Sequence, residues 1–93
     1  MDRHWAAVYE IFDLRVLASK RPFLYSCMNE ERQEIDWPAL KETARPWSHG
    51  EQVLVRIAHA LYNGGDRVTI DELAVLSSDV RRAVLNIIDR FYG

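Results

Sequence analysis

The stretch Trp47–Gly65, WSHGEQVLVRIAHALYNGG, constrains the fold of this chain more than any other part of its sequence. Ser48 can cap the start of a helix, and Glu51 completes the reciprocal hydrogen bonding of a capping box. The polar residues that follow lie on one narrow helical stripe, which we expect to be a solvated edge: Gln52, Arg56, His59 and Asn63. A helix that is otherwise apolar around most of its circumference is buried on several sides. We therefore predict a central buried helix over residues 49–63, ended by glycines that can adopt the left-handed cap.

Capping signals predict further helices on both sides of the central one. The preceding helix starts at Asp36 and ends near Ala44, because the residue after Ala44 comes directly before a proline. Thr69 and Glu72 form a second capping box, which starts a helix after the central one. A last helix begins within the serine pair at positions 77 and 78.

The N-terminal third carries weaker signals. We expect a helix over residues 2–18 and a turn or two of helix within 22–28, followed by a solvated loop over 29–34. No segment alternates apolar and polar residues for long enough to predict a strand. The chain has 93 residues, of which 48% are hydrophobic, and this composition suits one small globular domain. We predict an all-α fold, a compact single domain over residues 1–93 with four to five helices around the central helix.

Charge and cysteine content exclude several classes of protein. Lys and Arg number 12 against 14 Asp and Glu, and neither half of the chain is basic enough to follow a phosphate backbone. The single cysteine, Cys27, excludes an intramolecular disulfide and favours a reducing compartment. The N-terminal residues lack the apolar core of a signal peptide, and no apolar run reaches the ~20 residues that span a bilayer. We expect a cytoplasmic protein that binds no membrane.

Residues with catalytic or metal-binding chemistry are few. Cys27 is the one thiol, and the imidazoles are His4, His49 and His59. No pair of these residues has the spacing of a zinc site. The stretch from Asn63 to Glu72 resembles a calcium loop in composition, but its oxygen-bearing residues are out of register with one. We therefore expect no enzyme activity, cofactor or metal, and a small hydrolase using Cys27 is the weakest of three functional interpretations.

A DNA-binding regulator is the main alternative. Residues 52–92 have the outline of a helix-turn-helix core. The last helix carries side chains of the types that contact phosphates and bases: Arg81, Arg82, Asn86 and Arg90. Asp79 and Asp89 lie on the same helix and oppose a phosphate backbone. We expect negligible DNA affinity at physiological salt, because non-specific binding needs a basic face.

The first predicted helix has two apolar faces. One face should pack under the central helix: Trp5, Val8, Tyr9, Phe12 and Val16. The other face is a candidate protein interface: Ala7, Ile11, Leu14 and Ala18. This second face must be covered by the segment 22–28, be cancelled by a helix break near Asp13, or bind a second subunit or a partner protein.

Two motifs carry a resemblance to known sequences. The first is Trp47-Ser48-x-Gly50-Glu51 followed by Ala58-x-x-Leu61-Tyr62-Asn63-Gly64, and the second is the preceding Ile35-Asp36-Trp37-x-x-Leu40. Over residues 35–92 the chain resembles small uncharacterised bacterial and phage helical proteins. The resemblance implies an all-helical fold and a phage or prophage setting, and it implies no activity and no site residues.

The leading functional interpretation is a non-enzymatic protein–protein interaction module. Its partner is another protein or a second copy of the chain, with the candidate interface on the first helix. Nucleic acid is not expected as a partner.

Overall fold

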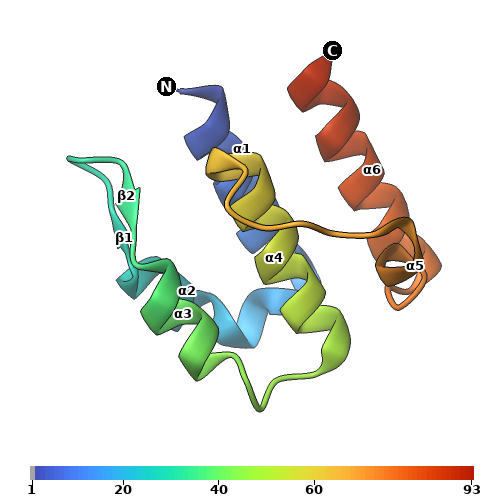
Figure 1. The fold of residues 1–93 in the computed structure, drawn as a ribbon, viewed down its shortest axis with the longest axis horizontal. Coiled ribbons are helices and arrows are strands. Elements are labelled where there is room, and N and C mark those ends of the chain that lie inside the picture. The colour runs from blue at the N-terminus through green and yellow to red at the C-terminus, as the bar shows by residue number, and fades with distance from the viewer. Residues whose placement is uncertain (1) are drawn as a thin grey trace.

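A computed structural model describes residues 2–93 of the chain. Its elements in chain order are helix α1 (Arg3–Phe12), the 3₁₀-helix η1 (Arg15–Lys20), α2 (Arg21–Ser26), the strands β1 (Met28–Asn29) and β2 (Glu34–Ile35), α3 (Trp37–Thr43), α4 (His49–Asn63), α5 (Ile70–Leu73) and α6 (Ser78–Tyr92) (Figure 1). Within this range no helix is long and apolar enough to cross a membrane.

The structure is mostly helical, as the sequence predicts, but it differs from the predicted bundle in two respects. Residues 2–93 contain six α-helices and one 3₁₀-helix, where four to five helices were expected. The fold is also not purely α, because β1 and β2 pair antiparallel with Met28 opposite Ile35. This hairpin closes the segment 29–34, which was predicted as an unpaired loop. The strands are too short for an alternating pattern to reveal them.

The helix predicted over residues 2–18 is broken after Phe12. Leu14 has extended backbone angles, with φ −60° and ψ 139°, and the chain continues as η1. The Arg21 guanidinium stabilises the break by donating hydrogen bonds to the carbonyl oxygens of Phe12, Asp13 and Leu14, at 3.3, 3.0 and 3.3 Å. Phe12 belongs to the last turn of α1, where carbonyl oxygens have no partner within the helix. The break thus depends on a side chain from α2.

The helices α3 and α4 begin and end where the capping signals predict. The Asp36 carboxylate accepts a hydrogen bond from the Ala39 N–H at 3.1 Å, and α3 is capped at Ala44. Gly64 ends α4 in the left-handed conformation with φ 71°. A side chain at this φ would be strained, which is why the helix stops at a glycine.

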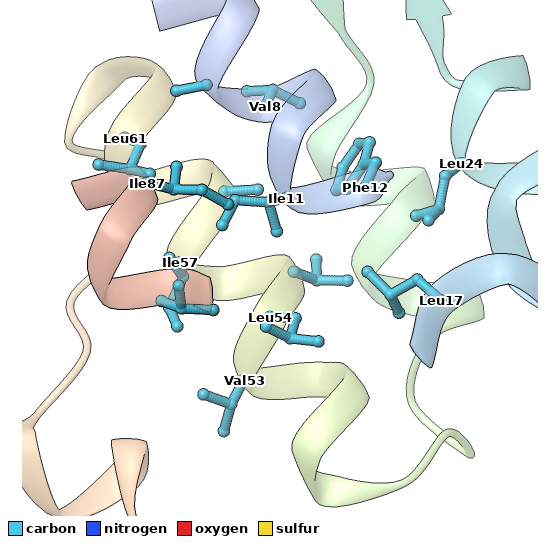
Figure 2. Close-up of a cluster of buried hydrophobic side chains, with 14 of the residues drawn as sticks. Val8, Ile11, Phe12, Leu17, Leu24, Val53, Leu54, Ile57, Leu61 and Ile87 are labelled. Atoms are coloured by element: carbon cyan, nitrogen blue, oxygen red, sulfur yellow. The ribbon is translucent and has the colours of Figure 1, made fainter. Parts of the chain in front are cut away.

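The core lies mainly between α1 and α4, and α6 packs against the other side of α1. The fully buried side chains include Val8, Ile11, Phe12, Leu17, Leu24, Leu40, Val53, Leu54, Val55 and Val84. Figure 2 shows Ile87 of α6 beside Ile11 of α1, with Ile57 and Leu61 of α4 in the same cluster. The first helix is therefore buried on two sides, and α6 provides the second cover.

Removing either capping hydroxyl should weaken the fold measurably. The Ser48 and Glu51 pair exchanges hydrogen bonds of 3.2 and 2.9 Å, and the Thr69 and Glu72 pair exchanges bonds of 3.2 and 3.0 Å. We expect Ser48→Ala and Thr69→Ala each to lower the free energy of unfolding by about 1 kcal/mol in urea titrations. Ser19→Ala, at an exposed position in η1, is the matched control and should change it little. An unchanged denaturation midpoint in Ser48→Ala would contradict the stabilising role of this cap.

Candidate functional site

The interface predicted on the first helix does not form one exposed surface. Ala7 and Ile11 are buried in the core, Leu14 is half-buried, and Ala18 is exposed on η1. The periodicity that grouped these four residues assumed a continuous helix to residue 18. Because α1 ends at Phe12 and α6 covers the next face, the N-terminal half of the predicted interface is interior.

The predicted DNA-contacting residues are also divided. The half-buried Arg81 donates to the carbonyl oxygens of Leu73 and Leu76, at 3.5 and 3.2 Å, and so ties α5 to α6. Arg90 pairs with Glu10 of α1 at 2.9 Å. Arg82 and Asn86 are exposed. Two of the four side chains therefore make contacts within the chain, and the exposed Arg90 is paired with a carboxylate.

The polar stripe of α4 is a contact surface within the chain, where a solvated edge was predicted. Arg56 donates to Asp66 at 3.3 Å, and also to the carboxylate of Glu72 and the carbonyl oxygen of Arg67. Lys41 of α3 donates to the other oxygen of Asp66 at 2.6 Å. This Arg56 cluster, formed by Lys41, Arg56, Asp66 and Glu72, holds the connecting segment (residues 64–69) and α5 against α4.

The acidic members of the Arg56 cluster remain charged well into the acid range. Burial raises the pKa of the Asp66 carboxyl, but the hydrogen bond from Lys41 and the charge of Arg56 outweigh it, so the pKa lies below its ordinary value. The backbone N–H of Thr69 lowers the pKa of Glu72, and Arg56 lowers it further. Both carboxylates are therefore ionised at neutral pH and attract Arg56.

His59 lies between the Arg56 cluster and the aromatic core. Its ring stacks on Trp37, with ring centres 4.3 Å apart and planes 14° apart, and the Gly65 backbone covers its edge. Nδ1 lies 4.0 Å from Asp66, too far for a hydrogen bond. Burial lowers the pKa of His59, with Lys41 adding to the effect and Asp66 opposing it. His59 is neutral at pH 7 and serves here as an aromatic packing residue.

Cys27 and the metal-binding residue types do not gather into a site. Cys27 is half-buried at the C-terminal end of α2, and burial raises the pKa of its thiol. A raised pKa reduces the thiolate fraction that nucleophilic chemistry needs. Within residues 2–93 no group of three or more His, Cys, Asp or Glu side chains is arranged to hold a metal ion.

An apolar cavity lies between α4, α5 and α6. We call it the interaction groove, a cavity of about 230 Å³ lined by Ile57, Ala60, Leu61, Val68, Leu73, Ile88 and Tyr92. All seven lining side chains are apolar or aromatic, and the small side chain of Ala60 leaves room between its larger neighbours. The wall formed by Val68 and Leu73 belongs to the segment that the Arg56 cluster holds in place.

Large apolar side chains at and near the groove are exposed to solvent. Tyr92 is 72% exposed, Leu85 is 47% exposed and Ile70 is 85% exposed. Leu85, Ile88 and Tyr92 share one face of α6, because they are spaced at three and four residues. The core-facing positions Val84, Ile87 and Phe91 lie on a separate face. This second apolar face of α6 was not predicted from the sequence, although helical periodicity would have revealed it.

Comparisons of the chain with protein-family models, curated proteins and solved structures find no match. The resemblance to small phage and bacterial proteins therefore stays a prediction, and function must be inferred from the chain's own surface.

Acidification is expected to destabilise the fold in two stages. The pKa of His59 lies below its ordinary value of 6.5, so the unfolded chain takes up this proton first and stability falls below about pH 6.5. The pKa values of Asp66 and Glu72 lie below 3.8 and 4.5. Their contribution is complete above those values and is lost as the pH falls through the lower folded-state values.

Urea titrations across the pH range measure both stages, and His59→Phe is the matched variant because it keeps an aromatic ring beside Trp37. In His59→Phe the loss of stability below about pH 6.5 should become smaller, and the loss at lower pH that comes from Asp66 and Glu72 should remain. If the wild-type stability instead increased as the pH fell from neutral to about pH 5, the conclusion that His59 is neutral in the folded protein would be contradicted.

Proposed function

We propose that this chain is a non-enzymatic protein-interaction domain that binds its partner through the interaction groove and the adjoining exposed face of α6. The observation that carries the proposal is an apolar groove, without a charged lining residue, bordered by the exposed Tyr92 and Leu85. Contiguous exposed apolar surface on a small protein is typical of a protein-binding site. An aromatic residue at the edge of such a groove is also a common centre of binding energy.

The bundle organisation supports this assignment. In the proposal α4 is the central helix, since it packs against α1 on one side and supplies one wall of the groove on another. A cytoplasmic location is part of the proposal because a single cysteine suits a reducing compartment. The phage or prophage setting rests on the sequence resemblance alone.

Photo-crosslinking in the cells that produce the protein tests the proposal. A photoreactive phenylalanine analogue replaces Tyr92 in one variant and Tyr25 in the control, because both tyrosines are exposed. We expect a covalent protein adduct from position 92 and a much weaker one from position 25. Adding Ile88→Glu, within the groove, should suppress the adduct while the circular dichroism spectrum stays helical.

Equal adducts from positions 92 and 25 would contradict the proposal, as would an adduct at position 92 that Ile88→Glu leaves unchanged. Mass spectrometry of the adduct identifies whether the bound protein is a second copy of the chain or another protein.

A further inference from the structure

The exposed face of α6 is nearly symmetric about its middle residue. Ser78, Arg81, Leu85, Ile88 and Tyr92 follow one another at spacings of three and four along this face, with Leu85 at the centre. Arg82 and Asp89 run along one edge of the face, one on each side of Leu85. Both are exposed. The edge therefore carries opposite charges on the two sides of the centre, three residues before Leu85 and four residues after it.

The charges on this edge favour one orientation when two α6 helices pair. A two-fold axis at Leu85 would place a second α6 antiparallel to the first, so that Arg82 of each copy lies opposite Asp89 of the other. The same operation brings Leu85 against its own counterpart in the second copy. Isologous contacts of this kind require one patch to be complementary to itself. A parallel two-fold arrangement would place the Arg82 and Asp89 edges of the two copies on opposite sides of the interface, so the Arg82–Asp89 pairs could not form.

Along the opposite edge of this α6 face, α5 of one copy and the groove of the other are brought together. α5 lies beside the N-terminal half of α6, where Arg81 binds the carbonyl oxygens of Leu73 and Leu76. The interaction groove lies beside the C-terminal half, where Ile88 and Tyr92 line it. An antiparallel two-fold pairing keeps each edge on its own side and exchanges the two halves. It therefore brings α5 of each copy, with its exposed Ile70, alongside the groove of the other.

We propose that a second copy of this chain occupies the interaction groove, in an antiparallel two-fold dimer centred on Leu85. The inference rests on the proposed function, in which the groove binds protein, and it names the partner. Leu85, Ile88 and Tyr92 supply the apolar contact, Ile70 of the second copy lies at the groove, and two Arg82–Asp89 pairs set the orientation. The net charge of −2 on each copy opposes this association only weakly.

Sedimentation velocity and light scattering of the purified chain over a wide concentration range test the dimer. We expect the wild-type chain to be dimeric and Leu85→Glu to be monomeric, because the substitution places two carboxylates at the two-fold axis. Val16→Glu is the matched control, since Val16 is also about half exposed, at 44%, and lies on η1. It should remain dimeric, and all variants should keep the helical circular dichroism spectrum.

A charge exchange tests the orientation. Arg82→Asp should raise the dimer Kd about tenfold, because two attractive pairs become two repulsive ones. Combining Arg82→Asp with Asp89→Arg restores opposite charges and should return the Kd to within about threefold of wild type. Failure of the double variant to recover would overturn the antiparallel arrangement.

A wild-type chain that is monomeric at every concentration, or a Leu85→Glu variant that remains dimeric, would overturn the dimer. These outcomes are distinct from failure of the proposed function. A monomeric chain that still forms a groove-dependent adduct with a different protein from position 92 would leave the protein-binding groove standing and remove the second copy as its occupant.

Discussion

Ile11→Arg is expected to unfold the domain. The Ile11 side chain is completely buried, in the cluster where α1, α4 and α6 meet (Figure 2). A guanidinium at this position would lose its hydration with no buried carboxylate to receive it, since the core contains no buried polar or charged residue in the described chain. Such a charge costs several kcal/mol. Domains of this size are stable by only about 5–15 kcal/mol.

Far-ultraviolet circular dichroism and thermal melting measure this effect. Val16→Arg is the matched control, because it places the same side chain at an exposed position of η1, and it should change the free energy of unfolding by less than about 0.5 kcal/mol. A folded Ile11→Arg variant with an altered association state would contradict the structure. That result would instead support the sequence-based prediction that Ile11 lies at an interface.

Arg56→Ala is expected to have the second largest effect, and the largest at a polar position. The substitution removes the hydrogen bonds that Arg56 donates to Asp66 and to the carbonyl oxygen of Arg67. It also leaves two carboxylates, Asp66 and Glu72, near each other without their shared cation. Because Arg56 is one-third exposed, solvent screening reduces the loss, and we expect about 1–2 kcal/mol for the bonds to Asp66 and Arg67.

Amide hydrogen exchange locates the effect. Exchange should accelerate across the connecting segment and α5, while the amides of the core helices α1 and α4 should accelerate least and keep most of their protection. Arg45→Ala is the matched control, because the Arg45–Glu42 pair is largely exposed on α3 and its neighbouring turn and should contribute little. Unchanged exchange in residues 64–73 of Arg56→Ala would show that the Arg56 cluster does not hold this segment.

The interaction groove depends on the same cluster. Val68 and Leu73 form one wall, and the contacts of Arg56 with Asp66, Arg67 and Glu72 hold the chain on either side of Val68. Loosening this wall should weaken binding at the groove without altering any residue that lines it. In the photo-crosslinking experiment, Arg56→Ala should therefore reduce the adduct from position 92 by changing the shape of the groove, while the residues that line the groove stay the same.

Local signals predicted the helix starts because a cap is made by residues three apart in the chain. Asp36, Ser48 and Thr69 each accept a hydrogen bond from a backbone N–H of their own first turn. A helix break near Asp13 was one of three alternatives left open for the first helix, and the structure confirms it. The sequence could not decide between them because the group that stabilises the break, Arg21, belongs to a later helix. The β1–β2 hairpin escaped because two-residue strands have no readable alternation.

The candidate binding surface could likewise be predicted only in part from the sequence. The residues of α4 and α6 that line the groove could be assigned to helices from sequence, and the spacing of Leu85, Ile88 and Tyr92 was present in the sequence. The groove itself requires α5 and the connecting segment to lie between the two helices, and this depends on Arg56 reaching residues well beyond the end of α4. A polar stripe read alone gives no sign of such partners, so the stripe was predicted to be solvated.

The sequence by itself determined that the chain is mostly helical, where α3 to α6 begin, and that α4 is buried on several sides. These properties follow from caps and periodicity, which act over one or two helical turns. Only the tertiary structure decided which apolar faces are covered. It placed α6 over Ile11, so the N-terminal half of the face predicted as an interface became core, and it left Leu85 and Tyr92 exposed. An apolar face shows that cover is needed, but which segment provides it depends on contacts between residues far apart in the chain.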